Sequence, residues 1–266
     1  MQIIEWPEFL EKALSLGGKT SAITVGVFDG LHRGHKTLIQ RVVAHNDSAV
    51  PVVVTFRQSN YKKAQNNGRE YSGSIFSFRQ KMAAFESLGI SITVVIEFSE
   101  SFRRMSGADF LRILQKQGKM SFLTVGSNFR CGYQLDTGAS AIQNFNAERN
   151  IPTAIVPVLT EGAIQISSSQ IRAAITRGDL KAATVMLGHP FTVDLAGAAV
   201  SDEAALAFDI SGQGRILPPP GRYAVCLLGE NVKLQTEILV EEGNIIIDRN
   251  LAERGDFEYV EFLPCT

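Results

Sequence analysis

The chain has 266 residues, of which 45% are hydrophobic and 20% are charged, and its formal net charge is -1. This length is enough for one large or two small domains, and a mean hydropathy of +0.05 disfavours global disorder. The nearly neutral charge gives no support for a broad basic face that binds nucleic acid. No apolar run reaches the length of a membrane span.

The N-terminus and the cysteines indicate the compartment. Residues 1–9 carry acidic side chains where a signal peptide needs positive charge. Cys131, Cys226 and Cys265 are far apart, odd in number and without a C-x-x-C pair, which is typical of reduced thiols. We therefore expect a cytoplasmic protein that binds neither nucleic acid nor membrane, and the sequence leaves its oligomeric state open.

After a helix predicted over residues 8–16, a strand–turn–helix unit follows. Alternating β-formers over 23–27 predict a buried strand, and the apolar spacing over 36–43 predicts a helix. Gly26 and Gly30 allow a sharp turn between them and a close approach of the backbone to a ligand.

His32 and His35 lie where this helix is expected to begin. A helix N-terminus has free N–H groups and a partial positive charge, so it favours phosphate. Two imidazoles there could donate hydrogen bonds to a triphosphate and stabilise the charge that develops as pyrophosphate leaves. The alternative is that both histidines only cap the helix, but the H-x-G-H spacing after a strand and a Phe-Asp-Gly turn favours the phosphate site.

Strands and helices then alternate. Strands are predicted at 50–56, 92–98, 122–126 and 155–159, and helices at 78–88 and 105–114, the latter with Ser106 as N-cap and Asp109 in its first turn. This order predicts a Rossmann-like parallel sheet of the α/β class, with ligands beyond the carboxyl ends of its strands.

Residues 57–74 are polar and without periodicity, so we interpret them as a long loop near the site. Tyr61, Lys62 and Lys63 could contact a ligand there, but a solvated loop is the favoured interpretation.

A second helix N-terminus is predicted at 166–172, Ile-Ser-Ser-Ser-Gln-Ile-Arg. The hydroxyl groups of Ser168 and Ser169 can cap the helix and bind phosphate oxygens. Arg172 lies one turn further on and can reach the same phosphates with its planar fork. An ordinary serine cap with a surface arginine is the alternative. We expect this helix start and the one that carries His32 and His35 to lie around one polyphosphate.

The pattern changes near His189. Short strand-like runs separated by glycine and proline turns are predicted at 195–200, 205–210, 223–228, 234–240, 244–247 and 257–263. This spacing predicts a small antiparallel domain, a β-barrel or a sandwich, of which we expect the β-barrel. We therefore divide the chain into domains at 1–188 and 189–266.

Three motifs in residues 21–191 carry a resemblance. The stretch 26–35, Gly-Val-Phe-Asp-Gly-Leu-His-Arg-Gly-His, resembles the H-x-G-H signature of the FAD synthase (FMN adenylyltransferase) module in bacterial bifunctional riboflavin kinase/FAD synthetases. Residues 166–172 resemble the Ile-Ser-Ser-Thr-x-Ile-Arg motif of that family, followed by its Gly-Asp and Leu-Gly-x-Pro elements. Residues 126–132 are similar to its Gly-x-(Asp/Asn)-Phe-x-Phe-Gly segment, with Cys131 in place of an aromatic residue. Arg57-Gln-Ser-Asn60 stands where the family usually has Glu-Pro-His-Pro.

The resemblance implies that ATP and FMN react to give FAD and pyrophosphate. It implies Mg²⁺ bridging the phosphates largely through water, without dedicated protein ligands. The catalytic residues it implies are His32, His35, Ser168 and Arg172. The implied ATP-binding residues are Gly26, Val27, Phe28, Asp29, Gly30, His32, His35, Ser168, Ser169 and Arg172. The implied flavin-binding residues are Asn128, Phe129, Arg130 and Gly132.

A weaker resemblance covers the tail. Residues 219–225 resemble the Pro-x-Gly-Val-Tyr-Ala-Val strand of the riboflavin kinase barrel, but the Gly-x-Pro-Thr-Ala-Asn loop that holds ATP and magnesium is absent from this sequence. We therefore expect a degenerate kinase-like barrel without kinase activity.

Two other functions remain open. An H-x-G-H nucleotidyltransferase could act on another phosphorylated acceptor: phosphopantetheine, nicotinamide mononucleotide or phosphoglycerol. The chain could also be a flavin-binding protein whose catalysis has decayed, although the retained histidines, serine and arginine argue against this.

Overall fold

The computed structural model describes residues 1–46, 48–57, 73–202, 205–252 and 255–264. The chain forms two compact units, and each is made of three separate stretches. Unit 1 contains Met1–Phe28, Gly34–Ser59 and Met82–Thr160, and unit 2 contains Asp29–Arg33, Asn60–Lys81 and Glu161–Thr266. The division at residues 188 and 189 that we expect from the sequence stays a proposal.

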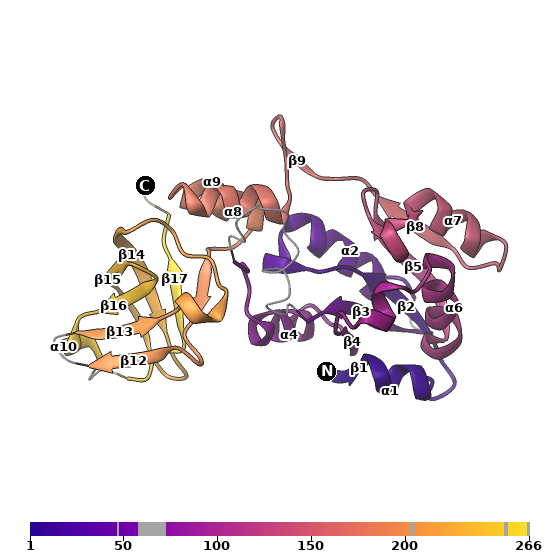
Figure 1. Ribbon diagram of the computed structural model, residues 1–266, viewed down its shortest axis with the longest axis horizontal. Helices are drawn as coiled ribbons and strands as arrows, with labels where there is room; N and C mark the ends of the chain where they lie inside the picture. Colours follow the sequence, from indigo (N-terminus) through magenta and orange to yellow (C-terminus); the bar gives the residue numbers. More distant parts are fainter. Residues whose placement is uncertain (47, 58–72, 203–204, 253–254, 265–266) are drawn as a thin grey trace. The chain divides into compact units, whose positions relative to one another are not determined.

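Unit 1 is built on a six-stranded sheet in the order β1-β4-β3-β2-β5-β8, and every neighbouring pair is parallel (Figure 1). Its strands are β1 (Gln2–Glu5), β2 (Thr20–Val25), β3 (Ala49–Phe56), β4 (Ile92–Ile96), β5 (Met120–Gly126) and β8 (Thr153–Val156). The predicted α/β class with a parallel Rossmann-like sheet is thereby confirmed. The edge strand β1 is an addition that the sequence pattern did not indicate.

Helices connect these strands. They are α1 (Trp6–Glu11), α2 (Arg33–Val43), α4 (Phe78–Ser87), α5 (Glu100–Arg103), α6 (Gly107–Gly118) and α7 (Ala139–Ala147). The predicted cap of α6 is confirmed, because the Ser106 hydroxyl accepts a hydrogen bond from the Asp109 N–H at 3.1 Å. The helix predicted over 8–16 is wrong in extent, because Lys12 leaves the helix with an extended backbone (φ -132°).

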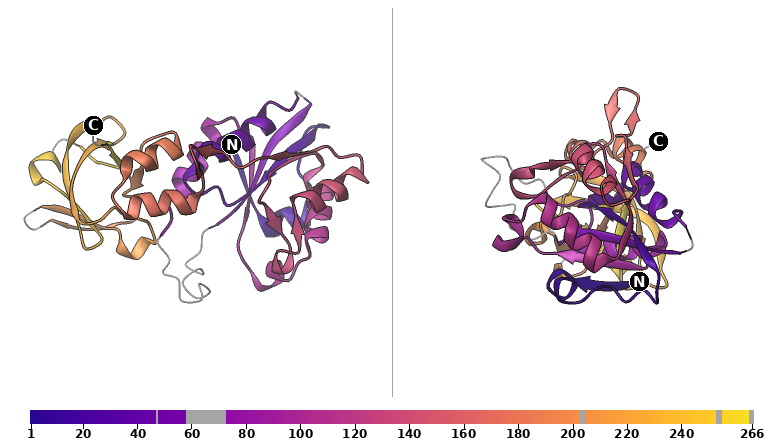
Figure 2. Two further views of the ribbon diagram at one scale, coloured as in Figure 1. Left: turned by 90° about the horizontal axis from the view of Figure 1, so that it is seen from above. Right: turned by 90° about the vertical axis from the view of Figure 1, so that its right-hand side faces the viewer.

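Both faces of the parallel sheet are covered by helices (Figure 2). On one face, α1, α6 and α7 pack on alternate strand residues around Trp6, whose ring lies 5.4 Å from that of Phe9 and 5.9 Å from that of Phe110. Val52 and Val54 belong to this core, whereas the intervening Val53 does not, as the two-residue period of a strand requires. The right-handed crossovers place α2 and α4 on the opposite face.

Unit 2 contains a curled antiparallel sheet of seven strands, in the order β11-β17-β14-β15-β16-β13-β12 (Figures 1 and 2). Its strands are β11 (Thr192–Asp194), β12 (Ala199–Asp202), β13 (Leu206–Asp209), β14 (Gly221–Leu228), β15 (Lys233–Glu241), β16 (Asn244–Ile247) and β17 (Tyr259–Phe262). The predicted antiparallel β structure is confirmed. The strand predicted over 195–200 begins too early, because Leu195 to Ala198 form a turn with Gly197 at φ 77° and β12 starts only at Ala199.

Unit 2 also contains helices and two-residue strands. Its helices are α8 (Ser168–Thr176), α9 (Leu180–Leu187) and α10 (Arg249–Ala252), and β10 (Ile164–Gln165) pairs with β9 (Thr160–Glu161). Unit 1 has a similar short pair, β6 (Arg130–Cys131) with β7 (Thr137–Gly138). Short 3-10 turns lie at Asp29–Leu31, Tyr133–Leu135 and Ser211–Gln213.

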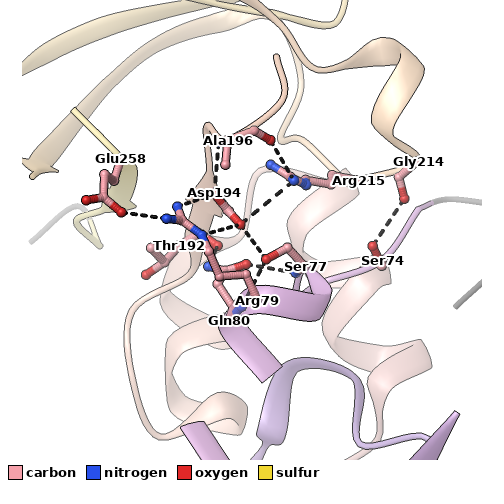
Figure 3. A network of polar contacts seen from close by, with 10 residues as sticks. All are labelled: Ser74, Ser77, Arg79, Gln80, Thr192, Asp194, Ala196, Gly214, Arg215 and Glu258. Atoms are coloured by element: carbon pink, nitrogen blue, oxygen red, sulfur yellow. Dashed lines mark hydrogen bonds and ion pairs between the residues drawn. The ribbon is translucent and has the colours of Figure 1, made fainter. Parts of the chain in front are cut away.

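A buried carboxylate ties the start of α4 to the antiparallel sheet (Figure 3). Asp194, 1% exposed at the end of β11, accepts hydrogen bonds from Arg79 Nη2 at 2.7 Å and from the Ser77 hydroxyl at 2.5 Å. Arg215 lies 3.8 Å from the same carboxylate, and Arg79 also binds Glu258 at 2.6 Å. Burial alone would raise the pKa of Asp194, but the hydrogen bonds from Arg79 and Ser77 hold it below its usual value.

The segment that precedes α4 is fixed by its backbone as well. Ser74 N–H donates to Gly214 O at 2.8 Å, and Ile216 N–H donates to Ser74 O at 3.1 Å. Gly73 lies so close to this partner that an added Cβ would be 2.5 Å from the carbonyl carbon of Arg215. Residues 73–80, which we call the anchor segment, are therefore held by the C-terminal part of the chain.

Candidate functional site

The strand order of unit 1 locates the predicted ligand segments. The chain leaves β2 to add β3 and β4 on one side and later adds β5 on the other side. In open α/β sheets, ligands bind beyond the carboxyl ends of the strands at such a switch point. Residues 26–28 follow β2 and residues 127–132 follow β5, so both segments begin at this point.

The backbone after β2 turns in an unusual conformation. Phe28 (φ 53°), Gly30 (φ 75°) and Leu31 (φ 43°) are all in the left-handed region. For a residue with a side chain this costs about 1–2 kcal/mol, so the turn needs contacts that hold it. Within unit 1, the buried Phe28 ring lies 5.5 Å from Phe85 and 5.2 Å from His35, edge-on to both.

Within unit 2, the side chain of Asp29 holds the turn. Its carboxylate is 1% exposed and accepts hydrogen bonds from Ile75 N–H at 3.0 Å and Phe76 N–H at 3.1 Å. Arg172 Nη2 donates to its other oxygen at 2.6 Å. Two backbone N–H groups of the anchor segment and one guanidinium therefore satisfy a buried negative charge.

Helix α8 contributes two of the predicted residues to the same turn. The Ser168 hydroxyl donates to the Asp29 carbonyl oxygen at 3.0 Å. Arg172 also donates from Nε to the Gly73 carbonyl oxygen at 2.9 Å, and its side chain is 16% exposed. The expected capping role of Ser168 and Ser169 is wrong, because the N-cap is Ser167, whose hydroxyl accepts from Gln170 N–H.

Gly30 is enclosed by other parts of unit 2. A Cβ on Gly30 would lie 2.9 Å from Ile75 Cγ2 and 3.1 Å from Leu187 Cδ2. The Gly30 carbonyl oxygen faces Nε2 of His189 at 3.1 Å. Both the left-handed backbone and this close packing require glycine here.

The two motif histidines differ in environment. His32 directly precedes α2, is 7% exposed, and burial lowers its pKa from 6.5 to about 4, although the charge of Asp29 and a backbone hydrogen bond oppose the shift. Its imidazole is therefore neutral at pH 7 and can donate one hydrogen bond. His35 lies in the first turn of α2 and is half-buried.

The segment after β5 is a tight loop within unit 1. Asn128 is exposed, and Phe129 is half-buried against the core. Arg130 Nε donates to the Leu135 carbonyl oxygen at 2.9 Å. Gly132 (φ 86°) passes so close to α6 that an added Cβ would lie 2.3 Å from Gly107 N. Their contacts with flavin stay predictions.

Comparison with protein families decides the class of this chain. The model of a family described as FAD synthetase matches residues 17–170, which is more than half of the chain. The chain belongs to the FAD synthetase family. The family predicted from the motifs at 26–35 and 166–172 is thereby confirmed.

Curated relatives of this family member carry consistent names. A bifunctional riboflavin kinase/FMN adenylyltransferase of Escherichia coli (strain K12) is 26% identical over 216 residues, 78% of this chain and 68% of that protein. A protein of the same name from Buchnera aphidicola subsp. Acyrthosiphon pisum (strain APS) is 26% identical over 176 residues, and the match spans only 56% of its length. An FAD synthetase of Listeria monocytogenes is 24% identical over 66% of this chain and 71% of its own.

A solved structure has the same fold. The crystal structure of a protein named macrolide-efflux protein from Streptococcus pneumoniae superposes with a TM-score of 0.81 at 21% identity, over 100% of this chain and 91% of that chain. At this identity the likeness shows the fold alone.

Several residues that hold the turn after β2 could not be predicted from the sequence. Ile75 and Phe76 act through backbone N–H groups, which leave no side-chain signal. His189 occupies the variable position of the Leu-Gly-x-Pro element, so the match of the flanking residues did not single it out. Tyr61, Lys62 and Lys63 lie outside the described residues.

Within the residue ranges that the structure describes, no three His, Cys, Asp or Glu side chains group into a cluster that could hold a metal ion. Nor does any helix within those ranges have the length and apolar character needed to cross a membrane.

Replacing Asp29 by Asn should lower the free energy of unfolding by about 3–5 kcal/mol, because Arg172 would keep an unpaired charge in a largely buried position. Urea unfolding followed by circular dichroism measures this. The matched control is Glu100→Gln, which removes the exposed partner of Arg104 on α5 and should change stability far less. Equal effects of the two substitutions would contradict the role given to Asp29.

His32 should make the stability depend on pH. Between pH 6.5 and pH 4 the unfolded imidazole binds a proton that the folded protein does not bind, so the free energy of unfolding falls as the pH falls. His32→Gln should reduce this fall by about 3 kcal/mol. Urea unfolding at a series of pH values tests this, with His45→Gln, a half-buried ring stacked on Phe122, as control. An unchanged slope in His32→Gln is the contradicting result.

Proposed function

We propose that this member of the FAD synthetase family transfers the adenylyl group of ATP to FMN, giving FAD and pyrophosphate. The observation that carries the proposal is the convergence on Asp29. Its carboxylate binds Arg172 and its carbonyl oxygen binds Ser168, so the glycine turn and the start of α8 lie together within unit 2. Both are places where backbone N–H groups favour phosphate.

The proposed reaction needs no strong base. An oxygen of the FMN phosphate, already anionic, attacks the α-phosphorus of ATP in line. A new P–O bond forms as the bond between the α-phosphorus and its bridging oxygen to the β-phosphate breaks, and that oxygen leaves with pyrophosphate. Catalysis is therefore mainly positioning and stabilisation of charge on the transferred and leaving groups.

The histidines take the stabilising role in this proposal. His32, neutral at pH 7, would donate one N–H to a phosphate oxygen, and His35 in the first turn of α2 would donate a second. Gly26, Val27 and Gly30 would allow the nucleotide to approach the backbone.

Ser168 and Arg172 take a revised role. The single hydroxyl proton of Ser168 is directed to Asp29, so phosphate contacts at α8 would come from backbone N–H groups of its first turn, at Ser168 and Ser169. Two nitrogens of Arg172 are engaged by Asp29 and Gly73, which leaves Nη1 to face the β- and γ-phosphates.

Substrates, metal and location complete the proposal. ATP and FMN are the small-molecule partners, with Asn128, Phe129, Arg130 and Gly132 on the flavin side. Magnesium would be held by the phosphates and water, where it neutralises phosphate charge. The reaction would take place in the cytoplasm, and the domain of residues 189–266 would lack riboflavin kinase activity.

Purified protein with ATP, Mg²⁺ and FMN should form FAD and pyrophosphate, identified by chromatography of the flavin product. Riboflavin with ATP should give no FMN. The other acceptors, phosphopantetheine, nicotinamide mononucleotide and phosphoglycerol, should give no adenylylated product. FMN binding without pyrophosphate release would support a decayed enzyme instead, and adenylylation of another acceptor would move the specificity away from flavin.

Replacing His32 or His35 by Ala should lower kcat by about 10²–10³, because each would remove one donor to the transition state. Steady-state kinetics with FMN and ATP measures the effect. His45→Ala is the matched control, since it removes an imidazole that lies just after α2 and stacks on Phe122, away from the proposed site. An unchanged kcat in both His32→Ala and His35→Ala would contradict the proposed mechanism.

A further inference from the structure

His189 fills the variable position of the Leu-Gly-x-Pro element and has no role in the proposed reaction so far. It follows the C-terminal cap of α9 at Gly188 and precedes β11. Its Nε2 lies 3.1 Å from the carbonyl oxygen of Gly30, which is 159 residues away in the sequence, and its Nδ1 lies 2.9 Å from that of Pro190. Carbonyl oxygens only accept hydrogen bonds, so a ring nitrogen binds one of them only when it carries a proton, and the single N–H of a neutral imidazole serves one of these two contacts at a time.

The contact with Gly30 acts on a sensitive part of the turn. A peptide unit is planar, so holding the Gly30 carbonyl oxygen fixes the plane that continues to the N–H of Leu31. Leu31 has a left-handed backbone (φ 43°), and the next residue is His32. A donor at the Gly30 oxygen therefore restrains the backbone that leads to His32.

His189 is itself held in place by the group of residues that binds Asp29. Its ring lies 5.4 Å from that of Phe76, at 35°. Phe76 is the anchor-segment residue whose N–H donates to the Asp29 carboxylate. Two residues beyond Pro190, the carbonyl oxygen of Thr192 accepts from Gln80 Nε2 at 2.9 Å, which fastens this connection to the same segment (Figure 3).

We propose that His189 is a positioning residue for adenylyl transfer, and that its Nε2–H holds the Gly30 carbonyl oxygen so that the turn presents His32 in its reactive orientation. Asp29 fixes the turn through its side chain, whereas His189 fixes the following peptide. The inference rests on the proposed function for its catalytic consequence, but the contact itself belongs to the folded protein.

Replacing His189 by Gln or by Asn distinguishes the role of Nε2 from that of Nδ1. The Gln amide nitrogen reaches the position of Nε2 and can still donate to Gly30, whereas the Asn amide nitrogen reaches only the position of Nδ1. In the full-length protein, His189→Asn should lower kcat for FAD formation by about 10- to 100-fold, with KM for ATP and FMN changed far less. His189→Gln should retain most of the wild-type kcat. The pair His45→Gln and His45→Asn, placed outside the proposed site, controls for loss of an imidazole.

Hydrogen exchange measures the effect on the turn independently of the kinetics. Hydrogen exchange at the amides of Leu31 and His32 should be faster in His189→Asn than in wild type, and close to wild type in His189→Gln. Wild-type kcat in His189→Asn, or equal losses in the Asn and Gln variants, would overturn the proposal whatever their stability. If the wild-type protein forms no FAD, the proposed function fails, and equal exchange rates in both variants would then overturn the Gly30 contact on their own.

Discussion

The buried carboxylate of Asp29 is the constraint on which the turn after β2 depends. A charge that is 1% exposed is tolerated only when hydrogen bonds and an opposite charge surround it, and here two N–H groups and Arg172 do so. Phe28 and Leu31 could relax to ordinary backbone conformations if this carboxylate were free to move. The ion pair therefore keeps a turn of high conformational energy in one shape, and the proposed adenylyl transfer would depend on such positioning.

A second buried carboxylate supports the first one from a distance. The anchor segment binds Asp29 with the backbone of Ile75 and Phe76, and it binds Asp194 with Ser77 and Arg79. The antiparallel sheet that carries Asp194 thus helps to hold the glycine turn within unit 2. This gives the sheet a structural use that does not require the kinase loop, whose sequence it lacks.

Much of this arrangement could be predicted from the sequence, because the strong signals are local. The alternation of strands and helices, the glycine turn and the Ser106 cap each depend on a few neighbouring residues, and the structure confirms them. The short edge strand β1 could not be predicted, because Gln2–Glu5 shows no clear alternation and is a strand only by pairing with β4. Helix α7 could not be predicted either, because polar residues such as Gln143 and Asn144 interrupt its apolar pattern.

The candidate site shows the same limit. The motif spacing made His32, His35, Ser168 and Arg172 the candidates. It could not show that Ser168 and Arg172 bind Asp29, since that pairing joins residues 139 and 143 positions apart. The choice of Ser167 over Ser168 as the cap depends on a one-residue difference in where the helix begins. Backbone donors such as Ile75 N–H are present in almost any sequence and so give no signal.

The pairing of Arg79 with Asp194 joins residues 115 positions apart, and it limits which residues can replace either of them. Without this carboxylate, Arg79 and the buried Arg215 would lose their shared acidic partner. Without Arg79, the buried acid would keep fewer donors. Substitution at either position restricts the residues that the other can carry. The antiparallel sheet therefore carries a constraint on its sequence that arises from a helix far away in the chain.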